Sequence, residues 1–251
     1  MAEPDERTFD VVSDGNRLAA GIVIPPRPRA SVILLHGIPS VSPSEPGDPG
    51  YPGLARRFAE HGYAAAWADL RAVRGSEGFF SIDGWVRDTV AIVDAVRAME
   101  GLDELPLALA GSSAGGAVST EAVRRGARVD LLALLAAPAT WVSYASTPTA
   151  AVERITEEAG MPLDPEVIAA PDAWAAEFGE VETERSIADV HVPVLIVHGS
   201  ADDVVPVDHA HRIAANAPGA ELEILNGAGH QLRKEPRAVE RVIEWLKARV
   251  G

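Results

Sequence analysis

Continuous apolar segments alternate with amphipathic segments along most of this chain. The apolar segments lack the alternation of a half-exposed strand, which indicates strands buried on both faces; they are residues 31–37, 64–70, 106–111, 131–138 and 192–199. The amphipathic segments, which repeat with the period of a helix, are residues 54–61, 82–99, 114–125, 209–216 and 236–250. This pattern predicts an α/β fold: a mostly parallel central sheet of about eight strands with helices on both faces.

Two further β-prone regions complete the predicted sheet. At the N-terminus, two such runs flank Asp14-Gly15-Asn16. These residues tolerate the positive φ angles of a tight turn, so we expect an N-terminal hairpin. A last strand is predicted at residues 220–227, shortly before the final helix.

Residues 139–190 interrupt the regular alternation. They include no clear strand, but they contain several prolines, several aromatic residues and two short helical candidates, at residues 150–159 and 172–178. A connection this long is usually functional or disordered, and the aromatic residues argue against disorder. We therefore expect a single domain over residues 1–251, with a small helical cap inserted at residues 139–190 over one end of the sheet.

The composition argues against one class of partner. Lys and Arg total 22 against 37 Asp and Glu, which gives a formal net charge of −15. Binding to phosphates needs clustered basic side chains, so we expect no nucleic-acid partner. The chain also has no cysteine, which excludes disulfides and thiolate metal sites.

The start of the chain, MAEPDERTFD, has neither the basic residues nor the apolar stretch of a signal peptide. No later apolar run is long enough to cross a bilayer. We therefore expect a cytoplasmic protein with no membrane partner. The sequence leaves its oligomeric state open.

A run of small residues carries the first chemical signal. Residues 111–115, GSSAG, fit the pattern G-x-S-x-G between a predicted strand and a predicted helix. A sharp turn in that context lifts the central serine, and the residues two before and two after it need almost no side chain. Ser113 meets this condition, whereas Ser112 has alanines at those positions. The pattern predicts Ser113 as a nucleophile; the alternative is tight packing of a helix on a strand, with both serines incidental.

Two later loops supply the groups that would activate this serine. Asp202 and Asp203 follow the strand predicted at residues 192–199, and His230 lies on a glycine-rich turn before the last helix. A serine hydroxyl is a poor nucleophile until an imidazole takes its proton, and an aspartate orients that imidazole. The chain order serine, aspartate, histidine accompanies such a serine turn. We predict a catalytic triad of Ser113, Asp202 and His230, with Asp203 as the alternative acid.

Acyl transfer also needs an oxyanion hole, because the tetrahedral intermediate carries a negative oxygen. One predicted donor is the backbone N–H of Ala114, the residue after the nucleophile. The second should come from the loop after the first parallel strand, LLHGIPS. Pro39 has no N–H, so we predict Ile38 as the second donor.

These segments together resemble the α/β-hydrolase superfamily over nearly the whole chain. The matching motifs are GSSAG, the HG of residues 36–37, PVLIVHGSADDVVP at residues 193–206 and GAGH at residues 227–230. The resemblance implies an α/β-hydrolase fold, with Asp202 in the place of the family's usual acid. The loop DLRAVRGSEG also resembles a family loop, which we expect to be structural and anchored by Arg71 or Arg74.

Departures from other branches of the superfamily narrow the expected activity. The segment after the first parallel strand is HGIP and not the HGGG of one lipase and esterase group, and there is no cysteine for a dienelactone-hydrolase-like nucleophile. Dehalogenases and epoxide hydrolases would have an aspartate at position 113. The chain is most similar to small serine esterases and to the catalytic domains of acylaminoacyl- and prolyl-oligopeptidase-type peptidases.

The resemblance implies a serine hydrolase that cleaves a carboxylic ester through an acyl-enzyme on Ser113. Alternatives on the same triad are a serine peptidase or amidase acting on short peptides, a haloperoxidase-like activity and an acyltransferase. A ligand-binding receptor on the same fold is the non-enzymatic alternative. The expected partner is therefore a small ester or a short peptide.

Other polar and aromatic residues change this picture little. No cofactor is expected, because no nucleotide-binding glycine motif follows a strand, and the histidine spacings do not indicate a metal site. His36 and His198 end predicted strands and are expected to be hydrogen-bonded structural groups. Aromatic residues of the expected cap are predicted to contact the substrate; they are Trp141, Tyr144, Trp174 and Phe178.

Overall fold

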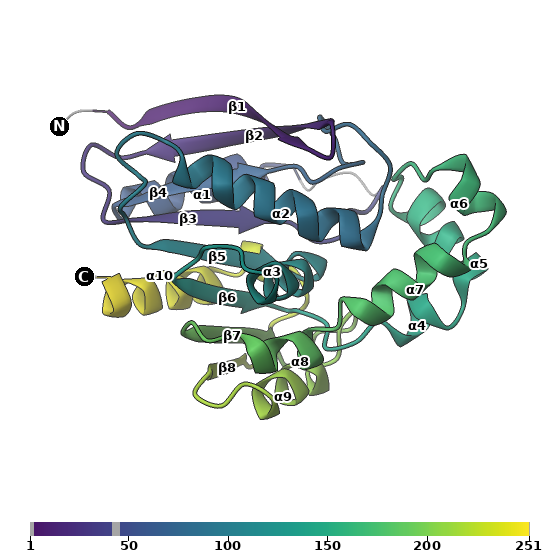
Figure 1. The fold of residues 1–251 in the computed structure, drawn as a ribbon. Coiled ribbons are helices and arrows are strands. Elements are labelled where there is room, and N and C mark those ends of the chain that lie inside the picture. The colour runs from purple at the N-terminus through teal and green to yellow at the C-terminus, as the bar shows by residue number, and fades with distance from the viewer. Residues whose placement is uncertain (1–2, 42–45, 251) are drawn as a thin grey trace.

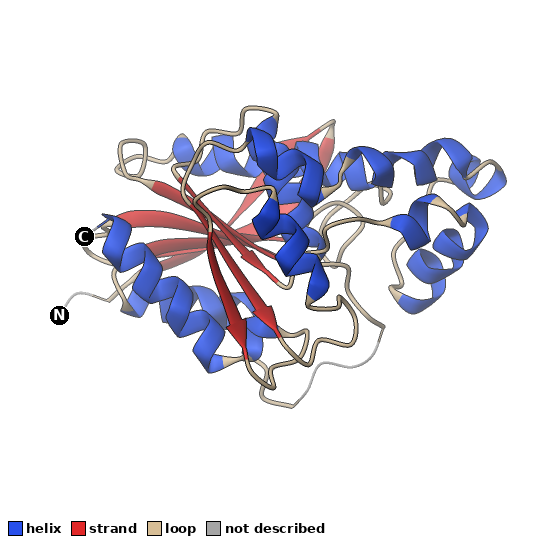
Figure 2. Ribbon diagram, turned by 90° about the horizontal axis from the view of Figure 1, so that it is seen from below, coloured by secondary structure: helices blue, strands red, loops and turns tan. Residues whose placement is uncertain are grey.

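The structure of this chain, a computed structural model, describes residues 3–41 and 46–250, and it is built around an eight-stranded sheet (Figures 1 and 2). The strands are β1 (Asp5–Ser13), β2 (Asn16–Ile24), β3 (Ala30–Leu35), β4 (Tyr63–Ala68), β5 (Leu107–Ser112), β6 (Leu131–Leu135), β7 (Val194–Gly199) and β8 (Glu221–Leu225). Their order in the sheet is β1-β2-β4-β3-β5-β6-β7-β8. The pairings of β2 with β1 and with β4 are antiparallel and the other five pairings are parallel, so the predicted mostly parallel sheet is confirmed.

The N-terminal hairpin forms where the sequence predicts it. β1 pairs with β2 from Asp5 opposite Ile24 to Ser13 opposite Asn16. The two residues between the strands, Asp14 and Gly15, have φ angles of 50° and 79°. Two consecutive positive φ angles match the right-handed twist of a two-residue hairpin, which explains the Asp-Gly sequence of this turn.

Helices cover both faces of the sheet, as Figure 2 shows. One face carries α2 (Ile82–Arg97), α3 (Ala114–Arg124) and α9 (Asp208–Ala215), and the other carries α1 (Gly50–Glu60) and α10 (Pro236–Val250). Along β3, Ile33 and Leu35 pack toward the first group of helices, whereas Val32 and Leu34 pack toward the second. The central strands β3, β5, β6 and β7 are apolar without alternation because both of their faces are buried.

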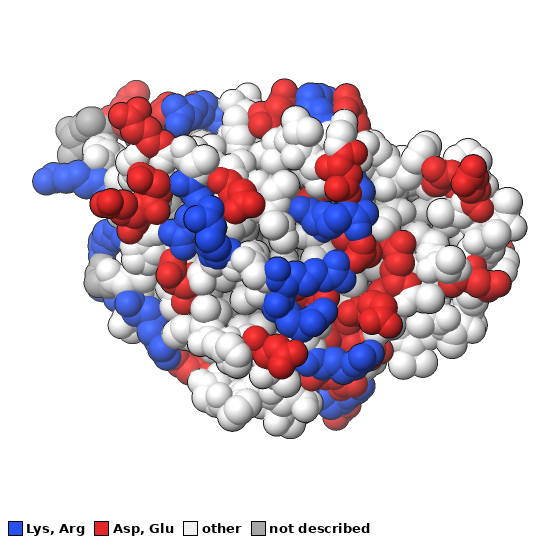
Figure 3. Space-filling view, in the orientation of Figure 1, with Lys and Arg blue, Asp and Glu red and all other residues white. Residues whose placement is uncertain are grey.

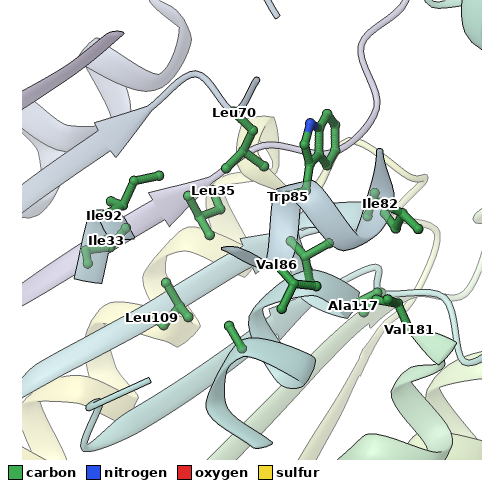
Figure 4. Packing of buried hydrophobic residues seen from close by; sticks show 14 of the residues in the cluster. Ile33, Leu35, Leu70, Ile82, Trp85, Val86, Ile92, Leu109, Ala117 and Val181 are labelled. Carbon is green, nitrogen blue, oxygen red and sulfur yellow. The ribbon is translucent and has the colours of Figure 1, made fainter. Parts of the chain in front are cut away.

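The larger core lies between α2, α3 and the sheet (Figure 4). Trp85 of α2 is fully buried, and its indole N–H donates to the Arg71 carbonyl at 3.0 Å. Ile33 and Leu35 of β3 approach this helix from the sheet. The core therefore fixes the carboxyl end of β3 against α2.

The chain between β6 and β7 forms a group of short helices, most of which lie beyond the carboxyl ends of the strands (Figure 1). They are α4 (Val142–Ala145), α5 (Pro148–Glu153), η1 (Arg154–Glu158), α6 (Pro165–Ala169), α7 (Asp172–Glu180), α8 (Thr183–Ser186) and η2 (Ile187–Asp189). We call residues 139–190 the inserted segment. The sequence pattern anticipates α7, but the helix expected at residues 150–159 is divided into α5 and the π-helical turn η1. Helices α4, α6 and α8 are too short for their periodicity to be recognised.

Basic and acidic side chains are interspersed on the face of the molecule that Figure 3 shows. The ion pairs agree with this view: Arg125 binds Asp83 at 2.6 Å, and Arg212 binds Glu184 at 2.6 Å. Within residues 3–41 and 46–250, none of the helices combines the length and the apolar character needed to span a bilayer.

Candidate active site

Ser113 occupies a sharp turn between β5 and α3. Its φ and ψ angles are 54° and −124°, a conformation that costs a residue with a side chain about 1–3 kcal/mol. The Ser113 N–H donates to the Leu135 carbonyl of β6 at 2.8 Å, and the Ser113 carbonyl accepts from Gly116 N–H at 2.8 Å. The turn is thus held from the neighbouring strand and from the first turn of the helix.

The small residues around Ser113 have a steric cause. A Cβ on Gly111 would lie 2.3 Å from the Gly115 carbonyl oxygen, and one on Gly115 would lie 2.5 Å from the His36 carbonyl oxygen. A Cβ on Gly37 would lie 2.7 Å from the Ser113 Cβ. Real Cβ atoms do not approach other atoms this closely, so the turn and the loop after β3 need glycine at all three positions.

The two adjacent serines lie in different surroundings. Ser112 lines a small cavity of about 20 Å³ on the side of the sheet that carries α1 and α10, together with Tyr51, whose hydroxyl donates to the Leu35 carbonyl at 3.3 Å. A cavity of this size holds about one water molecule and no substrate. The Ser113 Oγ instead lies beside Gly37, 3.2 Å from the position of a Cβ at that residue. The structure therefore places Ser113 and Ser112 in different surroundings, and the role of Ser113 as nucleophile stays a prediction.

Asp202 and His230 are joined by a direct hydrogen bond. The Asp202 Oδ2 lies 2.8 Å from the His230 Nδ1. The Asp202 side chain is fully buried, whereas that of His230 is 17% exposed. With Nδ1 bound to the carboxylate, Nε2 is the ring nitrogen left to exchange a proton with another group.

The loops that carry these two residues are tied to each other. The N–H of Ala201 donates to the Ala228 carbonyl at 2.9 Å, and the N–H of Ser200 donates to the Leu225 carbonyl at 3.0 Å. A Cβ on Gly199 would lie 2.2 Å from the Ala228 carbonyl oxygen. Glycine at the end of β7 thus permits the close approach that brings the two loops together.

Asp202 is held by more than His230. Its Oδ1 accepts from the N–H groups of Val204 at 3.0 Å and Val205 at 2.8 Å, and its Oδ2 lies 3.3 Å from the His198 Nε2. Burial by itself raises the pKa of this carboxyl, but hydrogen bonds from His198, His230 and Val205 outweigh burial and hold the pKa well below its usual range. Asp202 is therefore a carboxylate at neutral pH.

Asp203 faces a different environment from Asp202. It is exposed, and the bond to His230 is made by its neighbour. The chain enters a turn here in which the Asp202 side chain accepts from the backbone two and three residues ahead, and this turn directs the first aspartate inward. The structure thus places Asp202, and not Asp203, beside His230.

His36 lies beneath the loop that follows β3. Its Nδ1 lies 2.7 Å from the Gly37 carbonyl oxygen, and its Nε2 lies 3.0 Å from the Leu70 backbone nitrogen. The Leu70 N–H can only donate, so Nε2 accepts and the ring proton is on Nδ1, which donates to Gly37. Burial, assisted by the positive charge of Arg74, lowers the pKa of His36 to about 4. The expectation of a hydrogen-bonded structural histidine is met at His36.

This contact orients the peptide between Gly37 and Ile38. The peptide is trans, so its C=O and N–H point in opposite directions. Because His36 holds the carbonyl, the Ile38 N–H is directed away from His36, and it donates to no residue within the described chain. At the other side of the site, Ala114 is the first residue of α3, where backbone N–H groups have no intrahelical acceptor.

The loop after β4 is anchored by the two arginines that the sequence singles out. Arg71 is buried and binds the fully buried Asp88 of α2 at 2.7 Å. Arg74, which is half exposed, binds Asp69. Ala72 and Arg74 have positive φ angles of 67° and 45°, so these ion pairs hold a strained loop in place.

The four aromatic residues predicted to contact substrate form one cluster in the inserted segment. The rings of Tyr144 and Phe178 stack with centroids 4.8 Å apart, and Trp141 and Trp174 pack edge-on against Phe178. Trp174 and Phe178 are almost fully buried, and the Trp141 indole N–H donates to the Val181 carbonyl at 2.7 Å. The cluster is thus the packed core of the inserted segment, with Tyr144 the most exposed member; contact with a substrate stays a prediction.

One contact around Asp202 is not predicted from the sequence. His198 is expected to be a fully hydrogen-bonded structural residue, but only its Nε2 has a partner, and its buried Nδ1 has none among the described residues. The only signal in the sequence is that His198 lies four residues before Asp202, just ahead of a predicted loop. In the structure, His198 contacts the carboxylate that binds His230.

Solved structures share this fold over nearly the whole chain. The esterase Pf2001 of Pyrococcus furiosus is 18% identical, with a TM-score of 0.71 and coverage of 99% of this chain and 94% of that protein. Est1E of Butyrivibrio proteoclasticus, solved with ferulic acid bound, is 21% identical, with a TM-score of 0.69 and coverage of 96% of each chain. At these identities the comparison establishes the α/β-hydrolase fold.

Sequence relatives among curated proteins match this chain over a shorter stretch. YfhR of Escherichia coli is 26% identical over 180 residues, which is 71% of this chain and 57% of YfhR. A non-heme chloroperoxidase of Kitasatospora aureofaciens is 35% identical over 60 residues, which is 24% of this chain and 22% of that protein. This chain therefore spans little more than half the length of YfhR, and less of the chloroperoxidase.

The sequence profile of the prolyl oligopeptidase family matches residues 55–251. The matched region begins within α1 and includes β5, the Ser113 turn, the inserted segment and the loops of Asp202 and His230. The chain therefore belongs to the prolyl oligopeptidase family.

Proposed function

We propose that this protein is a serine hydrolase that cleaves a carboxylic ester through an acyl-enzyme on Ser113. The observation that carries the proposal is the 2.8 Å hydrogen bond between the Asp202 Oδ2 and the His230 Nδ1. It joins two loops at the same sheet edge as the strained turn of Ser113. A buried carboxylate bound to a partly buried imidazole, at the sheet edge where a serine is lifted on a tight turn, is the arrangement that activates a serine hydroxyl.

The first half of the proposed reaction forms the acyl-enzyme. The Ser113 Oγ attacks the ester carbonyl carbon, and the His230 Nε2 takes the hydroxyl proton. Asp202 stabilises the resulting imidazolium through Nδ1. When the tetrahedral intermediate collapses, the bond from the carbonyl carbon to the alcohol oxygen breaks, and His230 donates its proton to the departing alcohol.

The second half releases the acid. A water molecule gives a proton to the His230 Nε2 and attacks the acyl carbon, and the bond to the Ser113 Oγ then breaks as His230 returns the proton to the serine. The products are a carboxylic acid and an alcohol. These steps need only the three side chains, water and donors for the oxyanion.

The oxyanion donors in this proposal are the backbone N–H groups of Ile38 and Ala114. His36 holds the Gly37 carbonyl, which leaves the adjoining Ile38 N–H directed away from His36. Ala114 begins a helix, where an N–H and the positive end of the helix dipole both favour a developing negative charge. Removal of one such donor from a serine hydrolase typically lowers kcat by about 10²–10³-fold.

The inserted segment, residues 139–190, acts in this proposal as a cap that shapes access to Ser113. Its first helix follows β6, at the carboxyl edge of the sheet where Ser113 also lies. The N–H of Val41, from the loop after β3, donates to the Glu158 carbonyl at 3.0 Å, so this segment contacts the loop that carries Ile38. Substrate binding sites in α/β folds lie at this edge.

Hydrolysis of short peptides or amides is the second candidate activity. The match to the prolyl oligopeptidase family favours it, because that family's name describes action on peptides. The same three residues serve both reactions, and the two differ in the leaving group that His230 must protonate. The leaving group therefore separates the two activities in an assay.

Labelling by a fluorophosphonate tests the nucleophile. The reagent phosphonylates an activated serine, so wild-type protein and Ser112→Ala are expected to be labelled and Ser113→Ala is not. Ser112→Ala is the matched control because it removes the adjacent hydroxyl. Labelling that persists in Ser113→Ala would overturn the proposal.

A substrate panel tests the leaving group. p-Nitrophenyl esters of increasing acyl length and a set of aminoacyl-amides are compared by kcat/KM on wild-type protein. Higher values for the esters support the proposed ester hydrolysis, and higher values for the amides support the peptidase alternative. Turnover that is equal in Ser113→Ala contradicts both.

A further inference from the structure

His198 lies directly behind the acid that binds His230. It is the second-to-last residue of β7 and is fully buried. Its Nε2 lies 2.8 Å from the Val205 carbonyl oxygen and 3.3 Å from the Asp202 Oδ2. This imidazole therefore touches both the acid and the turn that holds the acid.

The surroundings of His198 determine where its proton is. A carbonyl and a carboxylate are both acceptors, so Nε2 carries the hydrogen. Nδ1 is buried and has no hydrogen-bond partner among the described residues. The N–H on Nε2 is therefore directed at Val205 and Asp202.

Val205 links this N–H to the other oxygen of the carboxylate. Its carbonyl accepts from His198, while its N–H donates to the Asp202 Oδ1 at 2.8 Å. The carboxylate is therefore restrained at both oxygens. Oδ1 is bound by the turn that His198 anchors, and Oδ2 lies between His198 at 3.3 Å and His230 at 2.8 Å.

We propose that His198 is a positioning residue, which anchors the 202–205 turn and orients the Asp202 carboxylate so that Oδ2 meets the His230 Nδ1. The proposal rests on the proposed hydrolase function. His198 touches no substrate in this scheme, and it acts through Asp202. It gives the Asp202 carboxylate a second imidazole neighbour, which in this scheme takes no part in proton transfer.

Other ionisable groups near these residues are already engaged. His209 of α9, which lies near His198, accepts the Ala139 N–H through Nδ1 at 2.9 Å. On the segment after His230, Arg233 and Lys234 bind Asp48 at 2.5 Å and 3.3 Å. The carboxylate that contacts His230 is that of Asp202, so a change in the orientation of Asp202 should appear in the acid limb of the kcat/KM profile.

The test compares His198→Gln with His198→Met. The two side chains have similar length and volume, but glutamine carries an N–H₂ that can donate to the Val205 carbonyl and methionine carries no donor. Steady-state kcat and KM on a p-nitrophenyl ester, the acid limb of the kcat/KM profile, and the thermal unfolding midpoint are measured for both. His198→Asn, which is too short to reach Val205, replaces the methionine variant if that variant does not fold.

We expect His198→Met to lower kcat by about 10–100-fold, the usual effect of losing a group that orients a reacting residue, with KM changed less than about 3-fold. A less well oriented carboxylate stabilises the imidazolium less, so the acid limb should move to lower pH. His198→Gln should restore kcat and the position of the acid limb.

Two results would overturn the role of His198. One is a methionine variant with the kcat and acid limb of wild type. The other is an equal loss in both variants that follows the folded fraction and leaves the acid limb unmoved, because that result describes packing alone. Failure of the proposed function is distinct, since wild-type protein would then hydrolyse no ester and take up no fluorophosphonate at Ser113.

Discussion

The Asp202 carboxylate binds His230 through Oδ2 at 2.8 Å, although Asp203 is the next residue along the chain. The distinction arises from the turn that follows β7, in which the Asp202 Oδ1 accepts the N–H groups of Val204 and Val205. These bonds hold the first carboxylate in the interior and leave the second exposed. Two chemically identical neighbours are thus assigned different environments by backbone geometry.

Substitution of the two aspartates should therefore have very different effects. Asp202→Asn replaces the acceptor for His230 Nδ1–H by an amide and should lower kcat by about 10⁴-fold, the loss seen when a triad aspartate is neutralised. Asp203→Asn should leave kcat within about 2-fold of wild type, as is usual for an exposed surface residue. Steady-state ester hydrolysis measures both, with circular dichroism to confirm folding. Equal losses would contradict the assignment of Asp202.

The buried His36 should make stability depend on pH. Its pKa is about 4 in the folded chain against 6.5 in the unfolded chain. Between these values the unfolded state binds a proton that the folded state does not, so this contribution is complete above about pH 6.5 and is lost as the pH falls toward 4. The free energy of unfolding should fall in that window by at most about 1.4 kcal/mol per pH unit from this residue.

Urea unfolding at pH values between 4 and 7 measures this dependence. His36→Asn should be less stable than wild type at neutral pH but should have a flatter dependence on pH within the window. His211→Asn, at an exposed position of α9, is the matched control. An unchanged slope in His36→Asn would show that other groups cause the dependence.

Glycine at position 111 should be indispensable for the fold of the site. A Cβ there would lie 2.3 Å from the Gly115 carbonyl oxygen, so Gly111→Ala should lower the free energy of unfolding by about 1–3 kcal/mol or more. Gly179→Ala is the control, because a Cβ there meets no atom within 4 Å and the residue lies in α7. In a helix this change should stabilise by about 0.5–1 kcal/mol. Chemical denaturation of both variants measures the difference, and similar effects would contradict the steric account.

Residues of the aromatic cluster in the inserted segment should differ in their effects on stability and on substrate binding. Trp174 is 3% exposed, so Trp174→Ala should lower the free energy of unfolding by about 3–5 kcal/mol. Tyr144 is more exposed and stacks on Phe178. If it also contacts the acyl chain, Tyr144→Ala should raise KM for long-chain p-nitrophenyl esters while leaving kcat for the acetate nearly unchanged. Equal KM changes for short and long esters would remove Tyr144 from the binding site.

Much of the fold follows from the sequence because its signals are local. Strands buried on both faces need continuous apolar runs, and the helices that cover them need one apolar side, so both patterns are visible along the chain. The ends of the strands are harder to predict. The strand expected at residues 131–138 ends at Leu135, because Ala136 adopts a φ of 52°, and alanine gives no indication of a positive φ angle.

Most of the structure of the inserted segment is not predicted by its sequence pattern. Its helices are short, and the periodicity of four or five residues does not distinguish a helix from a turn. Their arrangement is decided by contacts with distant residues: the Trp174 indole N–H donates to the Phe80 carbonyl at 3.2 Å, and Ser186 donates to the buried Glu121 of α3 at 2.6 Å. No local pattern contains these partners.

By itself, the sequence determined the layered α/β fold and singled out Ser113 and His230, because the apolar runs and the glycine spacing are visible in consecutive residues. Only the tertiary structure decided between Asp202 and Asp203, placed Ser112 against Tyr51 and brought His198 to the carboxylate. These contacts depend on which side chains from separate loops lie close together at one edge of the sheet. The packing of the whole chain brings those loops together, so no local sequence pattern predicts the contacts.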